Sequence, residues 1–423
     1  MIEQIIDLHI HSKYARACSP ALEIPAIAAA CEEKGVNLVA TGDFTHPAWF
    51  SHLEKNLVED HGGIYRVQDG KSPTRFIFGT EISCIYKHKD KVRRLHLLVF
   101  APSMAAAKQF NQKLEERGAN IRSDGRPIIG ITGKEVVQMC LNIDPRMMVI
   151  PAHAWTPWFA VFGSKSGYDS LEECFEELTP EIFAIETGLS SDPAMNHRLS
   201  RLDGITLVSN SDAHSLDNIG REANVLLFES EADITYDEIR RIIKTGDRKK
   251  FLYTIEFYPE EGMYHFDGHR ECKFSSAPAE TKRNNGVCPV CKKKVTVGVL
   301  YRVDDLADRR ERDIPTEKFI PHRYIVPLRE IIAASFEVGK KSKKVEMEYR
   351  RLITALGNEF GILLHQPIVK IKEFASDENI ATGVENVRLG KVRIEPGFDG
   401  QYGVVDPFFA AHRKKPTQTL LFD

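Results

Sequence analysis

Long apolar runs are missing from this sequence of 423 residues. No window approaches about eighteen consecutive apolar residues, so no segment is expected to cross a bilayer as a helix. The first residues also lack the basic region and apolar stretch of a secretory signal, because Asp7 follows directly after Ile5-Ile6. A GxxxxGKS/T phosphate loop is absent, which argues against an ATP-driven motor. These absences lead us to expect a cytoplasmic enzyme or binding protein.

The cysteines also lack the regular spacing of a disulfide-bonded domain. Five of the eight cysteines are scattered, and only Cys272, Cys288 and Cys291 cluster. In a reducing compartment such a cluster indicates metal ligation rather than disulfide bridges. Hydrophobic residues at 42% and charged residues at 28% are ordinary values for a folded globular protein. The length favours one large domain with one or two smaller ones.

Short apolar runs alternate with helical stretches through the first half of the chain. Strands are expected at Ile5–Leu8, Asn37–Ala40, Arg75–Phe78, Leu95–Phe100, Met147–Ile150, Glu181–Ile185 and Ile205–Ser209. Helices are expected at Ile24–Lys34, Ala105–Arg117, Gly133–Leu141, Leu171–Leu178 and Asp237–Thr245. This alternation predicts an α/β protein whose strands form a barrel or a barrel-like sheet.

Possible metal ligands follow these strands one after another. The alternation of side chains along a strand places His9 and His11 on one face. The further candidates are Asp43, Glu81, His96, His153, Asp212 and His214. Because the C-terminal ends of barrel strands meet at one mouth, we expect these side chains to lie together. Such a set suits hydrolysis of a phosphate ester, with Asp212 as an indispensable ligand that positions water and Glu81 as a bridging carboxylate.

The motifs in combination resemble those of the PHP (polymerase and histidinol phosphatase) superfamily. They are His9-x-His11, Thr41-x-Asp43, Glu81, His96, His153 and Asp212-x-His214. The resemblance implies a distorted (β/α)7 barrel over residues 1–250 that binds two or three divalent ions, zinc first, with manganese or magnesium as alternatives. The chain departs at Ala17, where the family carries a ligand. Glu186 also ends a strand, and structural and catalytic roles are equally open for it.

A second set of ligands follows the barrel region. His269-x-x-Cys272 and Cys288-x-x-Cys291 stand fifteen residues apart, a spacing that is normal for structural zinc. His265 is a less well spaced alternative to His269. Four protein ligands leave no open position, so we expect one structural zinc that stabilises a small module at residues 251–310.

The remaining chain adds a helical region, expected at residues 311–410. The order of the barrel, Asp267-Gly-His-Arg-x-Cys272 with Cys288-Pro-x-Cys291, and the stretch from Arg393 to Gly403 resembles the endonuclease Q family over nearly the whole chain. The resemblance implies a nucleoid-associated DNA repair endonuclease that cuts 5′ to uracil, hypoxanthine, xanthine or an abasic site. The alternatives are a small-molecule phosphatase of the histidinol-phosphate type and a non-catalytic DNA-binding protein with a degenerate barrel.

Two further predictions concern binding partners. Trp49, Trp155 and Trp158 all lie on loops that follow candidate ligands, so we expect them to wall a pocket for a base extruded from damaged DNA. Residues 411–423 are expected to form a flexible tail. Within it, Gln418, Leu421 and Phe422 match the short motif by which bacterial proteins bind the DNA polymerase sliding clamp.

Overall fold

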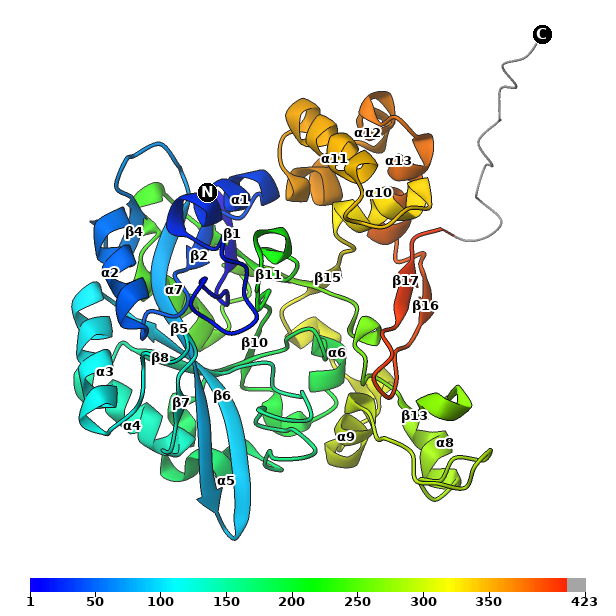
Figure 1. Ribbon diagram of the computed structural model, residues 1–423, viewed down its shortest axis with the longest axis horizontal. Coiled ribbons are helices and arrows are strands. Elements are labelled where there is room, and N and C mark those ends of the chain that lie inside the picture. The colour runs from blue at the N-terminus through cyan, green and yellow to red at the C-terminus, as the bar shows by residue number, and fades with distance from the viewer. Residues whose placement is uncertain (409–423) are drawn as a thin grey trace.

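The computed structural model describes residues 1–408 and comprises a mixed α/β body, a small module and a helical region (Figure 1). The body occupies the left of the view, with the helical region at the upper right and the module at the lower right. None of the helices in residues 1–408 has the length and apolarity of a membrane span. The expected α/β class is confirmed.

All seven predicted strands are present in the body. They are β1 (Ile2–Asp7), β2 (Leu38–Ala40), β5 (Arg75–His88), β6 (Lys91–Ala101), β8 (Met148–Pro151), β9 (Ala184–Glu186) and β10 (Thr206–Val208). Two longer strands, β11 (Ala223–Phe228) and β12 (Phe251–Glu256), are additional to the prediction. The shorter strands β3 (Leu57–His61), β4 (Ile64–Val67) and β7 (Ile128–Ile129) pair at the edge of the sheet or along β5.

The strands surround one apolar interior, although their directions are mixed. The pairs β1–β2, β2–β5 and β9–β10 are parallel, whereas β1–β11, β5–β6 and β6–β8 are antiparallel. One buried cluster draws a residue from every strand of this ring: Ile6, Leu38, Ile77, Leu98, Ile150, Ala184, Val208 and Leu226. The arrangement is therefore barrel-like, but the antiparallel β5–β6 hairpin departs from a regular βα repeat.

The predicted helices of the body begin close to the expected residues. They are α1 (Ile24–Lys34), α3 (Met104–Glu116), α4 (Gly133–Ile143), α5 (Leu171–Phe175) and α7 (Tyr236–Thr245), with α2 (Pro47–Asn56) and the single turn α6 (Pro193–Asn196) in addition. Local signals explain the boundaries. Pro25 lies in the first turn of α1 and Gly35 ends it in a left-handed conformation, while Thr132 and Glu135 form a capping box on α4.

The large sheet continues beyond residue 250, where a domain boundary was expected. β12 pairs with β11, and β15 (His322–Tyr324) pairs in parallel with β12. The small module is an excursion between these two strands and contains β13 (Asp267–His269), β14 (Phe274–Ser276), α8 (Pro278–Arg283) and α9 (Val299–Leu306). The hairpin of β16 (Arg393–Glu395) and β17 (Val404–Asp406) returns to the module, where Phe266 bridges to Phe398. Backbone pairing, which the sequence pattern did not reveal, thus joins the body to the later segments.

The helical region consists of α10 (Leu328–Phe336), α11 (Lys343–Leu356), α12 (Ile368–Phe374) and α13 (Glu378–Arg388). It is attached to α1 of the body by a buried ion pair, because Nζ of Lys34 lies 2.7 Å from Oε2 of Glu359. Arg350 of α11 also pairs with Glu33 of α1, at 2.8 Å. These contacts fix the helical region relative to the body.

Candidate metal centre

Four side chains from three separate segments meet inside the body. His9 and His11 follow β1, Glu81 lies within β5, and Asp212 follows β10. Nε2 of His11 lies 3.1 Å from Oδ1 of Asp212 and 3.3 Å from Oε2 of Glu81. Nε2 of His9 lies 3.5 Å and 3.6 Å from the same two oxygens. One ligand atom of each residue lies within 4.8 Å of the others, so the four can hold a metal ion together.

Glu81 also belongs to a second cluster, with His96 and His153. Its Oε1 lies 2.6 Å from Nδ1 of His96 and 3.1 Å from Nε2 of His153. The register of the β5–β6 hairpin explains the first contact, because Glu81 pairs with Leu98 and is therefore a diagonal neighbour of His96 on one face. The two oxygens of Glu81 face different clusters, which is the geometry of a bridging carboxylate.

An unpartnered nitrogen indicates that the first cluster fits a divalent ion. Nδ1 of His9 lies 3.0 Å from Oε1 of Glu186, which fixes the ring and leaves Nε2 facing Glu81 and Asp212. This Nε2 is buried and has no hydrogen-bond partner, which is costly for a polar atom. An imidazole lone pair among carboxylate oxygens is a donor set that zinc and related ions bind. Ions held by these clusters would polarise a phosphate ester and lower the pKa of a water molecule.

Asp43 and His214 were both predicted as ligands, but they lie beside the clusters. Oδ1 of Asp43 lies 2.9 Å from Nδ1 of His11, and Oδ2 accepts hydrogen bonds from the backbone N–H and the hydroxyl of Ser12 at 2.6 Å and 2.7 Å. Nδ1 of His214 lies 2.9 Å from the carbonyl oxygen of Asp212. Both oxygens of Asp43 are therefore engaged, and its contacts orient His11 in the way that Glu186 orients His9.

Three residues of the centre have left-handed backbone conformations. The φ angle is 41° at Asp43, 29° at His153 and 46° at Asp212. Such conformations cost about 1–3 kcal/mol each for residues other than glycine, and they concentrate at functional sites. Gly188 permits the turn at His153, because a β-carbon at position 188 would lie 2.6 Å from Cβ of His153. The fold thus maintains strain where the candidate ligands gather.

The charges of the centre favour ionised carboxylates. Burial acts to raise the pKa of Glu81, but the neighbouring histidines and Arg126 hold that pKa well below its usual range. Burial has the same effect on Asp212, and the charges of His9 and His11 outweigh it, so the pKa of Asp212 is also lowered. The surrounding carboxylates raise the pKa of His9 against the effect of burial. The two carboxylates are therefore ionised, as ligands of a cation must be.

Only one of the three predicted pocket tryptophans lies at the surface. Trp49 is fully buried, and its Nε1 donates to the carbonyl oxygen of Gly42 at 2.8 Å. Trp155 is 1% exposed and donates to Oδ1 of Asn196 at 2.8 Å. The prediction that both wall a substrate pocket is wrong, because their loops fold back onto the core. Trp158 is 44% exposed and lines a cavity of about 230 Å³ with Thr156, Pro157, Ser190, Pro259, Gly262, Met263, Tyr264, His265 and Val299.

The predicted zinc ligands come together in the small module. One ligand atom each of His269, Cys272, Cys288 and Cys291 lies within 4.8 Å of the others. Nδ1 of His269 is 3.7 Å from Sγ of Cys291, and Cys288 is fully buried. His265, the alternative, lies outside this cluster and lines the cavity beside Trp158. The module therefore contains a closed set of four candidate ligands.

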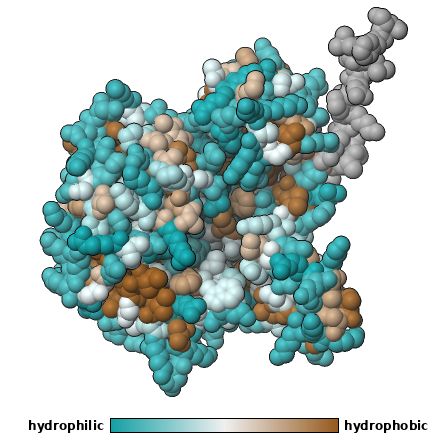
Figure 2. Space-filling view, viewed as in Figure 1, coloured by the Kyte–Doolittle hydropathy of each residue, from teal (hydrophilic) through white to brown (hydrophobic). Residues whose placement is uncertain are grey.

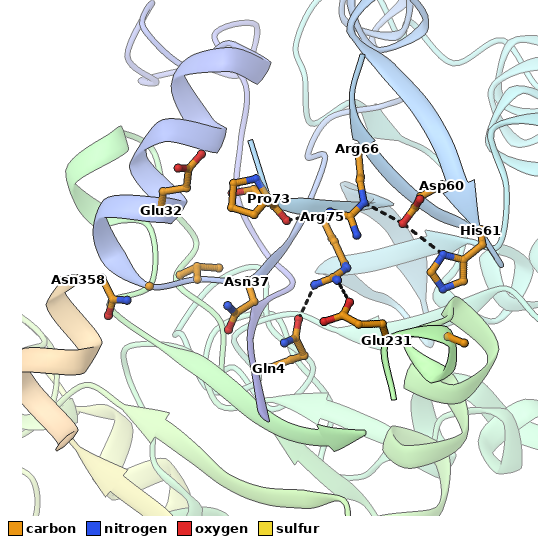
Figure 3. A pocket seen from close by; sticks show the side chains of 14 residues that line it. Gln4, Glu32, Asn37, Asp60, His61, Arg66, Pro73, Arg75, Glu231 and Asn358 are labelled. Atoms are coloured by element: carbon orange, nitrogen blue, oxygen red, sulfur yellow. Dashed lines mark hydrogen bonds and ion pairs between the residues drawn. The ribbon is translucent and has the colours of Figure 1, made fainter. Parts of the chain in front are cut away.

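A larger cavity, of about 1110 Å³, lies at the opposite end of the strands (Figure 3). Gln4, Asn37 and Arg75 line it from the first residues of β1, β2 and β5 or from just before them. Arg75 donates hydrogen bonds to Gln4 and Glu231, and these contacts are drawn as dashed lines in Figure 3. The ligand clusters of residues 1–408 lie elsewhere, so this cavity is not the candidate active site.

The chain is similar in sequence to known families. Residues 327–391 match the model described as the MJ0043 C-terminal domain. The uncharacterized protein YqxK of Bacillus subtilis is 29% identical over 388 residues, which cover 89% of this chain and 90% of that protein. The uncharacterized protein MJ0043 of Methanocaldococcus jannaschii is 30% identical over 258 residues, which cover 60% of this chain and 31% of that protein.

Two solved structures match nearly the whole chain. The lesion-specific endonuclease PfuEndoQ of Pyrococcus furiosus is 31% identical with a TM-score of 0.83, over 96% of this chain and 95% of that one. Endonuclease Q in complex with a 27-mer duplex, which carries an abasic lesion at the active site, is 31% identical with a TM-score of 0.82, over 96% of both chains.

The α/β body and the carboxylate shared by two histidine-containing clusters define a metal-dependent hydrolase. The extent of the match to the solved relatives makes the assignment more specific. The chain belongs to the endonuclease Q family.

Proposed function

We propose that this protein is a DNA repair endonuclease that hydrolyses the phosphodiester bond immediately 5′ to a deaminated base or an abasic site. The observation that carries the proposal is the carboxylate of Glu81, which faces both ligand clusters. It lies in a chain that aligns along almost its whole length with an endonuclease Q bound to abasic DNA. We propose two ions for the clusters, zinc first, with manganese or magnesium as alternatives.

The residues of the centre would hold two ions, and the hydrolysis would take place between them and the bound DNA. His9, His11 and Asp212 would hold one ion and His96 and His153 the other, with Glu81 touching both. The oxygen of water would form a bond to phosphorus while the bond from phosphorus to O3′ breaks. The products would be a 3′-hydroxyl, which gains a proton, and a 5′-phosphate on the lesion side.

Asp212 is the carboxylate best placed to orient the attacking water. Its side chain is 25% exposed, whereas the side chain of Glu81 has no exposed surface. A carboxylate that is partly open to solvent can accept a hydrogen bond from a water molecule that enters the site. We therefore assign to Asp212 both ligation and the positioning of water.

The cavity beside Trp158 is the pocket that we propose for the extruded base. It lies next to the centre, because Oγ1 of Thr156 in its wall is 3.1 Å from Nδ1 of His153. In Figure 2 the surface is hollowed between the body and the small module, and both contribute to the cavity wall. Nδ1 of His265 is buried there without a partner. Uracil and hypoxanthine carry a carbonyl where cytosine and adenine carry an amino group, so a donor in this wall would favour deaminated bases.

The first test is cleavage of an end-labelled duplex with one deoxyuridine, with Asp212→Asn and the exposed Asp69→Asn as matched variants. A single nick 5′ to the lesion, retained in D69N and lost in D212N, is expected. Cleavage of a chromogenic phosphomonoester without cleavage of the duplex would favour a small-molecule phosphatase instead. Binding of the duplex without any hydrolysis would favour a non-catalytic DNA-binding protein.

A second proposal concerns Gln418, Leu421 and Phe422, which lie outside the described residues. On their sequence pattern alone, we propose that they bind the DNA polymerase sliding clamp. Deletion of residues 418–423 should abolish binding to a purified clamp and leave nicking of a short duplex unchanged. Equal clamp binding by the full and shortened chains would refute the proposal.

A further inference from the structure

Arg126 lies at the edge of the carboxylate that joins the two clusters. Its Nη1 donates to Oε2 of Glu81 at 2.9 Å, and its side chain is 23% exposed. The residue stands between α3 and β7, in a segment that carries none of the metal-ligand motifs. The guanidinium therefore brings a permanent positive charge to the mouth of the centre.

The segment that carries Arg126 is held firmly in place. The backbone N–H of Ser83 donates to the carbonyl oxygen of Pro127 at 2.9 Å, and the N–H of Arg126 donates to Oδ1 of Asp124 at 3.0 Å. A β-carbon at Gly125 would lie 2.5 Å from Oδ2 of Asp43, so only glycine fits this passage beside the centre. The position of the guanidinium is thus set before any substrate binds.

Most hydrogen-bonding capacity of this guanidinium is unused within the described chain. The bond to Glu81 is the one side-chain hydrogen bond of Arg126 in residues 1–408, although a guanidinium has five N–H donors. Its other nitrogens are not among the buried atoms without partners. Arg221 differs, because its Nε and Nη2 donate to the carbonyl oxygens of Ser211 and Asp212 and support that loop. Of these two arginines, Arg126 is the one with donors available to a ligand.

We propose that Arg126 is a catalytic residue that binds a non-bridging oxygen of the scissile phosphate and stabilises the charge that develops there. The inference rests on the proposed function, because it takes a phosphodiester as the substrate. A planar guanidinium matches phosphate oxygens, and donors fixed in advance at a site of developing charge accelerate reactions strongly. Glu81 would hold one edge of the guanidinium while the remaining donors face the phosphate.

The test compares Arg126→Gln and Arg126→Lys with Arg122→Gln, a control in the same loop whose side chain is 73% exposed. Two quantities are measured for each: metal content and kcat for nicking. We expect R126Q to lose about 100- to 1000-fold in kcat with unchanged metal content, R126K to lose less, and R122Q to match the wild type. Loss of bound metal in R126Q would assign Arg126 to the support of Glu81 and overturn the proposal.

A second substrate separates contact with the phosphate from an indirect effect. In a duplex with a methylphosphonate at the scissile position, one charged non-bridging oxygen is replaced by a methyl group. The penalty of R126Q should shrink to a few-fold on this substrate, and an equal penalty on both substrates would overturn the proposal. Hydrolysis of bis(p-nitrophenyl) phosphate tests Arg126 without a lesion. Cleavage of this diester but of no lesion duplex by the wild type would refute the proposed function. The comparison of R126Q with the wild type on the diester would still test the role of Arg126.

Discussion

Nδ1 of His9 lies 3.0 Å from Oε1 of Glu186, and neither side chain is exposed by more than 1%. Oε1 of Glu186 also accepts a hydrogen bond from Asn210 at 2.8 Å, and Oε2 accepts one from the backbone N–H of His153 at 2.7 Å. Glu186 therefore contacts one residue of each cluster, His9 and His153, but is not itself among the candidate ligands. These contacts are those of a residue that orients ligands, and on them we propose a positioning role for Glu186.

The first prediction follows from that contact. Glu186→Gln should weaken metal binding by about 10- to 100-fold, because partners of ligating histidines fix the ring and its tautomer. Titration of the metal-free protein, followed by calorimetry, measures the effect. The exposed Glu177→Gln serves as the control and should bind metal like the wild type. Equal affinity in E186Q would show that His9 is held by other contacts.

Glu81 should influence more than one ion. Because its two oxygens face different clusters, Glu81→Ala should lower the metal content of the body by more than one ion per chain. His96 belongs only to the second cluster, so His96→Ala should lower the metal content by one ion at most. Elemental analysis of the purified variants decides between these results. A loss confined to one ion in E81A would contradict a bridging role.

Removal of zinc from the small module should unfold that module alone. The module has little apolar core of its own, and its four ligands are held together by the metal. We therefore expect the module to fold only when the metal is bound. Cys288→Ser and Cys291→Ser should each lose one equivalent of zinc and expose residues 265–300 to protease, while the body remains resistant. Protection of that segment in both variants would show that it folds without metal.

The ion pair between Lys34 and Glu359 should stabilise the helical region on α1. Both side chains are less than 10% exposed, and breaking a buried pair from one side typically costs about 3–5 kcal/mol. Glu359→Ala should therefore accelerate hydrogen exchange in α10 to α13. The control is the solvent-exposed pair of Lys340 and Glu330, for which Lys340→Ala should cost less than about 1 kcal/mol. Equal hydrogen exchange of α10 to α13 in E359A and K340A would show that the buried pair does not stabilise the helical region.

Trp158 and Trp155 should behave differently when shortened. Trp158→Ala should reduce the preference for uracil over thymine with little loss of stability, since the side chain is 44% exposed. Trp155→Ala should destabilise the protein by about 3–5 kcal/mol, because it creates a cavity in the core. Competition between the two duplexes, together with thermal unfolding, separates the effects. An unchanged preference for uracil over thymine in W158A would show that the cavity beside Trp158 does not recognise the base.

The sequence by itself determined the strand and ligand order of the body. Alternation along β1 placed His9 and His11 on one face, and the spacing of the cysteines predicted the cluster at His269, Cys272, Cys288 and Cys291. These signals are local, because side-chain periodicity and short ligand spacings depend on residues a few positions apart. The expected helices began near the right residues for the same reason.

Only the tertiary structure decided which of these residues meet and which face a cavity. Asp43 lies behind His11, Trp49 and Trp155 turn into the core, and Arg126 reaches Glu81 from a loop 45 positions away in sequence. The pairing of β12 with β11, which carries the sheet past residue 250, is also a long-range contact. Such contacts depend on the packing of distant segments, so no local pattern encodes them.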